Sequence, residues 1–101
     1  MMKERMQKLT ESEIQSILER YPEWKLESND GLQSFHFEKK FSSFQTAFSF
    51  ITKLALVSES LDHHAEIWNV YNLVRLKLYT HDQNGLTKRD EAFIEQVMKP
   101  N

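Results

Sequence analysis

The chain has 101 residues, 40% of them hydrophobic, with two glycines, two prolines and no cysteine. This composition is typical of one compact globular domain over residues 1–101, and it excludes disulfides and thiol chemistry. The formal net charge of −2 gives no electrostatic footprint for nucleic acid or an acidic membrane surface. No apolar run approaches the ~20 residues of a membrane span, and the charged start MMKERMQKL lacks the apolar segment of a signal peptide. We therefore expect a cytoplasmic protein that binds neither nucleic acid nor membranes.

The first predicted element is a helix that begins in the stretch LTESEI. Thr10 and Glu13 have the spacing of a capping box, and Pro22 stops the helical pattern of apolar residues that follows. Residues 24–27 and 32–38 then alternate between apolar and polar side chains on either side of the turn cluster Ser-Asn-Asp-Gly. Together these two segments predict a β-hairpin.

A broad apolar stripe predicts a central helix packed across the sheet, and Ser42 with Gln45 is its candidate capping box. The stripe consists of Phe44, Ala47, Phe48, Ile51, Leu54, Ala55 and Leu61. From Trp68 to Thr80 the period changes to two, which predicts a long half-buried strand or a pair of strands. One face of this segment holds Val70, Val74, Leu76 and Leu78, and the other holds Asn69, Tyr71, Arg75, Lys77 and Tyr79.

The last predicted helix lies in LTKRDEAFIEQVM, where Thr87 and Asp90 form the capping pair. Its buried stripe is Phe93, Ile94 and Val97. The order α-β-β-α-β-β-α predicts an α+β domain, with one antiparallel sheet of about four strands and three helices packed on one face. A small core and an exposed sheet edge favour a homodimer or homotetramer.

Three of the four histidines lie at predicted junctions between elements. His63 and His64 are adjacent where the central helix ends, and His81 follows the last strand. Adjacent residues do not share a helical face, and no cysteine is present, so a zinc site is the less favoured interpretation. Histidine exchanges protons readily near neutral pH, so the cluster indicates acid–base catalysis, with Glu59 and Asp62 close enough to orient an imidazole. The alternative is that the pair only complements the helix dipole.

The segment ESLDHHAEIWNVYNLVRLKLYTHDQNGLTKRD resembles the signature of the pterin-4a-carbinolamine dehydratase family. The matching positions are Glu59, His63, His64, Ala65, Tyr71, His81 and Asp90. FHFEKKFSSFQTAFSFITKLALVSE resembles the family's second strand and central helix, YPEW its segment with the active-site tryptophan, and FIEQV its last helix. Many members have proline where this chain has Ala65, which leaves the backbone freer because proline fixes φ.

The resemblance implies a hydro-lyase that converts 4a-hydroxytetrahydropterin to quinonoid dihydropterin and water, in tetrahydrobiopterin recycling, without a metal or organic cofactor. It implies catalytic roles for His63, His64 and His81, substrate contacts by Trp24, Ala65 and Thr80, and supporting roles for Glu59, Asp62 and Asp90. Simpler roles are a core anchor for Trp24, strand propensity for Thr80, a helix cap for Asp90 and a surface position for His36. Because family members also serve as a transcription factor's dimerisation partners or as assembly factors, a non-catalytic interaction module is the alternative function.

Overall fold

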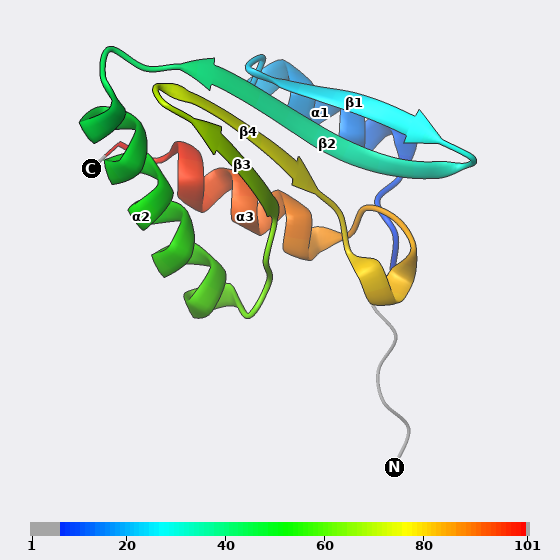
Figure 1. Cartoon of the computed structure of the whole chain (residues 1–101). Helices are drawn as coiled ribbons and strands as arrows, with labels where there is room; N and C mark the ends of the chain where they lie inside the picture. Colours follow the sequence, from blue (N-terminus) through cyan, green and yellow to red (C-terminus); the bar gives the residue numbers. More distant parts are fainter. Residues whose placement is uncertain (1–6, 101) are drawn as a thin grey trace.

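The structure, a computed structural model, describes residues 7–100 and shows one antiparallel sheet with three α-helices packed against one of its faces (Figure 1). The four strands lie in the order β1-β2-β4-β3. The predicted α+β class and the α-β-β-α-β-β-α order are confirmed. Residues 1–6, on which the signal-peptide expectation partly rests, and Asn101 lie outside the described part. The elements are α1 (Glu11–Arg20), β1 (Trp24–Asn29), β2 (Leu32–Lys40), α2 (Phe44–Leu61), β3 (Glu66–Val70), β4 (Leu73–Leu78), the 3₁₀ turn η1 (His81–Gln83) and α3 (Lys88–Met98).

Capping boxes begin α1 and α3 at the predicted residues. The Thr10 hydroxyl accepts a hydrogen bond from the Glu13 N–H at 3.1 Å, while the Glu13 carboxylate accepts one from the Thr10 N–H at 2.8 Å. The bond from the Thr10 N–H, followed by the one from the Lys88 ammonium, lowers the pKa of Glu13 from 4.5 to about 2. Thr87 and Asp90 form the same reciprocal box at the start of α3.

The α2 helix differs from its prediction at its start and on its outer face. Its cap is Ser43 and not Ser42, because the Ser43 hydroxyl accepts the hydrogen bond of the Thr46 N–H at 3.1 Å. The predicted stripe is also wider than the area that the sheet covers. Phe44 and Phe48 remain 48% and 52% exposed and Ala55 is exposed too, so three of the seven stripe residues face away from the core.

Both pairs of consecutive strands are hairpins with two-residue turns. Asp30 and Gly31 form the first turn with φ of 51° and 81°, the region that short hairpin turns require. The second turn divides the segment predicted from Trp68 to Thr80 into two strands and changes the parity of its alternation. Val70 pairs with Leu73, so it lies on the opposite face from Val74, whereas the sequence pattern placed both on one face.

The covered face of the sheet and the inner sides of the helices form the core. The strands contribute Trp24, Phe35, Phe37, Val74, Leu76 and Leu78, and the helices contribute Ile14, Ile17, Leu54, Phe93, Ile94 and Val97. The other face is open and mostly charged, because alternate side chains of a strand point to opposite faces. Its side chains include Lys25, Glu27, His36, Glu38, Glu66, Arg75 and Lys77.

Candidate active site

The two adjacent histidines lie at the corner between α2 and β3. The helix ends at Asp62, which adopts a left-handed conformation with φ of 49°, as aspartate does more readily than most residues. The N–H groups of Asp62 and His63 both donate to the Ser58 carbonyl, which completes a helix C-cap. Asp62 thus supports the corner through its backbone. Beyond it His63 turns inward and is 7% exposed, while His64 stays exposed.

His63 is joined to a buried carboxylate. Its Nε2 atom lies 2.7 Å from Oδ1 of Asp90, which has no exposed surface. The second oxygen, Oδ2, accepts hydrogen bonds from the Thr80 hydroxyl at 2.8 Å and from the Thr87 N–H at 2.9 Å. Three donors therefore satisfy a carboxylate that burial alone would strongly disfavour. Asp90 forms the capping box of α3 with Thr87 as predicted, and it also contacts His63.

The Asp90 contact determines which nitrogen of His63 has a free lone pair. An ionised carboxylate only accepts hydrogen bonds, so Nε2 of His63 holds a proton and donates it to Asp90. In the neutral ring the lone pair is then on Nδ1. This nitrogen has no hydrogen-bond partner within residues 7–100. In these residues the only fully buried side-chain polar atom without a partner is Nε1 of Trp24, so Nδ1 of His63 is not fully buried. Nδ1 of His63 therefore keeps some contact with solvent, although the residue as a whole is only 7% exposed.

The other two histidines are exposed, and each contacts one neighbour. His64 Nε2 lies 2.9 Å from Oε2 of Glu59, in the last turn of α2. His81 opens η1, and its ring packs beside that of Tyr79 with centroids 4.1 Å apart and planes tilted by 41°. Both imidazoles thus combine a defined neighbour with free access to solvent.

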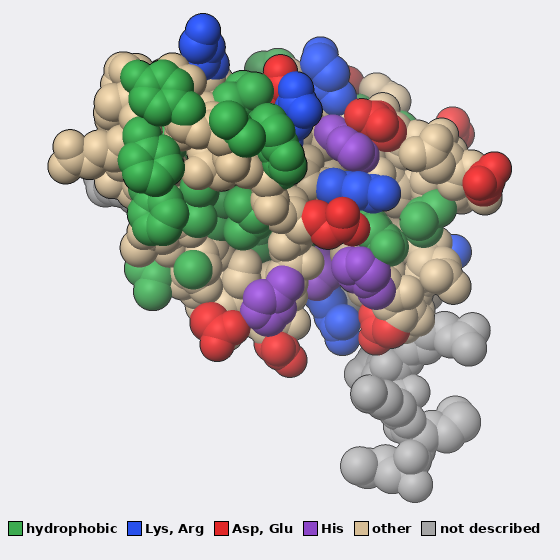
Figure 2. Space-filling model, in the orientation of Figure 1, with side chains coloured by type: hydrophobic (Ala, Val, Ile, Leu, Met, Phe, Trp, Pro, Cys, Tyr) green, Lys and Arg blue, Asp and Glu red, His purple; other side chains and the backbone are tan. Residues whose placement is uncertain are grey.

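The chain segments that carry the three histidines meet at one corner of the sheet. The register pairs Glu66 with Lys77, so the start of β3, next to His64, lies beside the end of β4, which leads to His81. Asp90 connects the same segments from inside, because it binds both His63 and Thr80. Figure 2 shows histidine side chains gathered near the lower edge of this face, with basic and acidic side chains directly above them.

The other predicted site residues Trp24, Ala65, Thr80 and Tyr71 are packed in the core, bonded to Asp90 or placed away from this corner. Trp24 is 2% exposed and packs against Phe37 on the covered face, with ring centroids 5.1 Å apart. It therefore offers no free face to a ligand, and its position fits the core-anchor role. The Thr80 hydroxyl is bound to Asp90, Ala65 packs against the core, and Tyr71 lies in the β3–β4 turn at the far end of the hairpin.

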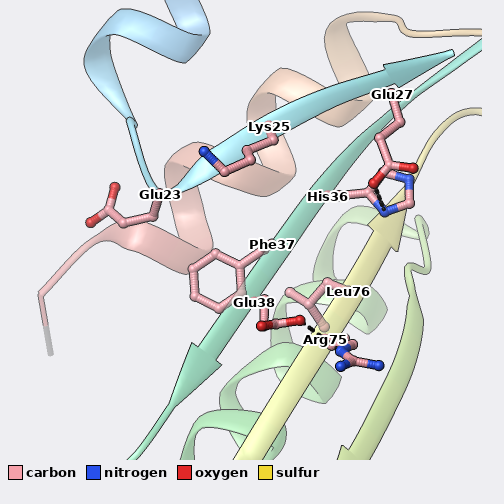
Figure 3. Close-up of a pocket in the computed structure, with 8 residues that line it drawn as sticks. All are labelled: Glu23, Lys25, Glu27, His36, Phe37, Glu38, Arg75 and Leu76. Atoms are coloured by element: carbon pink, nitrogen blue, oxygen red, sulfur yellow. Dashed lines mark hydrogen bonds and ion pairs between the residues drawn. The ribbon is translucent and has the colours of Figure 1, made fainter.

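A separate hollow of about 500 Å³ opens on the uncovered face of the sheet (Figure 3). It is lined by Glu23, Lys25, Glu27, His36, Phe37, Glu38, Arg75 and Leu76. His36, expected at the surface, is half-buried here, with Nδ1 3.2 Å from Glu27 and Nε2 2.9 Å from the Ser34 hydroxyl. Sequence reasoning missed this hollow because its residues come from three strands. The alternation that placed polar side chains on one face was the signal available.

Among residues 7–100, no three His, Cys, Asp or Glu side chains converge in a way that suits a metal ion. No helix in these residues has the length and apolar character needed to cross a membrane.

Known proteins match this chain over nearly its whole length. The family model described as Pterin 4 alpha carbinolamine dehydratase matches residues 7–99. A relative from Chloroflexus aurantiacus is 38% identical over 96 residues, which cover 92% of this chain and 99% of the relative. A relative from Burkholderia multivorans is 41% identical over 94 residues, which cover 89% of this chain and 89% of the relative. Both bear provisional names as pterin-4-alpha-carbinolamine dehydratases.

Two solved structures share the fold. A transcriptional coactivator/pterin dehydratase from Brucella melitensis has a TM-score of 0.77 at 38% identity, covering 89% of this chain and 95% of that one. The second is a pterin dehydratase-like protein identified as a RuBisCO assembly factor in the α-carboxysome. It has a TM-score of 0.62 at 20% identity, and the match covers 73% of this chain and 83% of that one. At this identity the match shows only that the two proteins share a fold. On the match of residues 7–99 and these identities, the chain belongs to the pterin-4a-carbinolamine dehydratase family.

Proposed function

We propose that this protein is a dehydratase that converts a 4a-hydroxytetrahydropterin to a quinonoid dihydropterin and water. The observation behind the proposal is His63, whose Nε2 is held by the buried Asp90 while Nδ1 is left free, with the exposed His64 next to it in the chain and the exposed His81 in a neighbouring segment. Positioned acid–base groups of this kind accelerate proton transfers by roughly 10²–10⁴-fold. Membership of the family and the name of the Brucella melitensis neighbour support the same reaction.

The reaction needs two proton transfers, and the three histidines divide them. The 4a-hydroxyl leaves as water after it takes a proton from an acid, and the ring nitrogen gives its proton to a base as the new double bond forms. His63 is suited to be the base, because Nδ1 has the lone pair and Asp90 stabilises the ring once it is charged. His81 acts as the acid at the hydroxyl. His64, held by Glu59, exchanges protons between the site and solvent.

Turnover of synthetic 4a-carbinolamine tests this proposal. We expect single alanine substitutions at His63, His64 and His81 to slow dehydration, with the largest loss, about 10²-fold or more, at His63. The losses at the exposed His64 and His81 are smaller, because water can partly replace an exposed imidazole. His36→Ala, a histidine outside the corner, is the matched control and should keep the wild-type rate. Wild-type rates in all three site variants, with folding verified by circular dichroism, would show that the cluster is not catalytic.

We also propose that the protein is a homo-oligomer, a dimer or a tetramer. Among residues 7–100, seven large apolar side chains are 42–68% exposed: Phe44, Phe48, Leu56, Ile67, Trp68, Val70 and Tyr71. Hydrophobic side chains gather over α2 in Figure 2. The exposed residues of α2 in this set are uncharged and lie along one side of the helix, so the same face of a second copy is a suitable partner in a two-fold pairing.

Phe48→Asp is expected to reduce the mass in solution to that of a monomer, because pairing would bury the new charge without a partner. Light scattering at micromolar concentration measures this mass. Thr46→Asp adds the same charge to an exposed position of α2 that points nearly opposite to Phe48, because residues two apart in a helix face in nearly opposite directions, and it should leave the oligomer intact. A wild-type protein that is already monomeric at this concentration would refute the assembly.

The apolar face also fits a second candidate function, a non-catalytic interaction module. The two structural neighbours are named as a coactivator/pterin dehydratase and as an assembly factor. An ordered oligomer that shows no carbinolamine turnover would favour this candidate over the dehydratase.

A further inference from the structure

The open face of β4 leads from the centre of the sheet to the histidine corner. Lys77, Tyr79 and His81 follow one another at alternate positions along the chain. The Lys77 ammonium lies over the Tyr79 ring, 5.7 Å from its centroid, and the Tyr79 ring lies 4.1 Å from that of His81. These two contacts place the ammonium within about 10 Å of the His81 imidazole.

Lys77 is a cation without an anionic partner among residues 7–100. The nearby charges are paired elsewhere, since Arg75 binds Glu38 at 2.6 Å and His36 binds Glu27 at 3.2 Å. The register sets Lys77 between His36 and Glu66, but no ion pair joins Lys77 to Glu66 within the described residues. Lys25, on the far side of His36 in the same row, likewise forms no ion pair there. Two lysines that form no ion pair among the described residues therefore lie in one row, on either side of His36, and this row is suited to an added anion.

The setting of Lys77 makes its charge effective toward a ligand. The residue is half-buried, and the ring of Tyr79, also half-buried, limits where the ammonium can go. A partly desolvated ammonium attracts an anion more strongly than one on a fully exposed side chain. Lys25 is exposed, so its contribution is the smaller one.

The position of Lys77 also matches the shape of a pterin. This step rests on the proposed dehydratase function, which places the reacting C4a atom beside His63 and His81. The C6 arm is attached one atom beyond the neighbouring N5, so it leaves the ring close to the reacting atoms. We infer that the substrate is a pterin whose C6 arm bears an acidic group, a phosphate or a carboxylate, and that Lys77 binds this group.

Binding of stable dihydropterins tests this substrate class separately from catalysis. Three probes share the dihydropterin ring and differ in the C6 arm. The arm of the first is neutral and hydroxylated, that of the second ends in a phosphate monoester, and that of the third bears a glutamate. Calorimetry should show that the wild-type protein binds one of the two acidic probes about tenfold more tightly than the neutral one, the effect of one charge-assisted hydrogen bond at a half-buried site. Which acidic probe is preferred distinguishes a phosphate from a carboxylate.

Variants locate the origin of the preference. Lys77→Gln should bring the ratio of the neutral and acidic Kd values to about one. Glu66→Gln should increase the ratio, because it removes the carboxylate that the register places across from Lys77. Lys40→Gln, at the other end of the sheet, is the matched control and should keep the wild-type ratio.

The outcomes separate this inference from the function on which it rests. Equal affinity of the wild-type protein for all three probes, together with turnover of a neutral carbinolamine, would overturn the acidic-arm inference and leave the dehydratase proposal intact. Failure to bind any pterin and to dehydrate any carbinolamine would overturn both. A preference that persists in Lys77→Gln would also contradict the assignment of Lys77.

Discussion

Asp90→Asn is expected to lower the rate of carbinolamine dehydration by roughly 10²–10⁴-fold while the fold is kept. The carboxylate of Asp90 accepts hydrogen bonds from three donors, and two of them, the Thr80 hydroxyl and the Thr87 N–H, share Oδ2. The carbonyl oxygen of asparagine can keep those two bonds. Its amide nitrogen then faces Nε2 of His63, where the carboxylate oxygen stood.

The consequence for His63 is a change of tautomer. An amide N–H is a donor, so Nε2 of His63 must accept, and the ring proton moves to Nδ1. The nitrogen that is open to solvent then has no lone pair, and His63 can no longer remove a proton from the substrate. Because the ring stays in place, kcat should fall far more than pterin binding weakens, and steady-state kinetics separates the two.

The same substitution has a measurable cost in stability. Asp90 is also the second member of the α3 capping box, and the substitution removes one charge-assisted hydrogen bond and a negative charge at the helix N-terminus. We expect a loss of about 1–3 kcal/mol in the free energy of unfolding, measured by urea denaturation. Asp30→Asn, in the exposed β1–β2 turn, is the matched control, since asparagine also tolerates the positive φ there. An unchanged kcat in a folded Asp90→Asn variant would show that the Asp90–His63 contact supports the fold and not catalysis.

Local signals in the sequence predicted most of the fold. The capping boxes of α1 and α3 join residues three positions apart, and the turn at Asp30 and Gly31 is read from adjacent residues. Predictions failed where the outcome depends on distant parts of the chain. The face of Val70 depends on how many residues the β3–β4 turn takes up, and the exposure of Phe48 depends on how much of α2 the sheet covers.

The candidate site shows the same division. The three histidines were identified from their spacing and from the family resemblance, but the partner of His63 was not. Asp90 is 27 positions away, and the cap that it forms is a sufficient local reason for its presence. Its contact with His63 becomes visible only when the end of α2 and the start of α3 are placed together. Trp24 shows the opposite case. The family resemblance predicted that it contacts the ligand, but in the structure its large side chain is buried in the core.

Trp24→Ala is expected to lower the free energy of unfolding by about 3–5 kcal/mol, the cost of removing a large buried side chain and leaving a cavity. Trp24 is 2% exposed and contacts Phe37, which in turn stacks on Phe50 of α2 at 5.5 Å, so its loss loosens the contact between sheet and helix. Single domains are stable by about 5–15 kcal/mol, so this variant should unfold at much lower urea concentration.

Trp24→Leu separates a core anchor from a ligand contact. Leucine keeps an apolar side chain but has no flat ring, and the change removes Nε1–H, a buried donor that has no partner in residues 7–100. Removing an unsatisfied donor offsets part of the packing loss, so this variant should be more stable than Trp24→Ala. Because the indole is enclosed on the covered face, its pterin Kd, measured by calorimetry, should equal that of the wild type. A folded Trp24→Leu variant with a much weaker pterin affinity would mean that the indole reaches the ligand after all, which requires β1 to separate from the core.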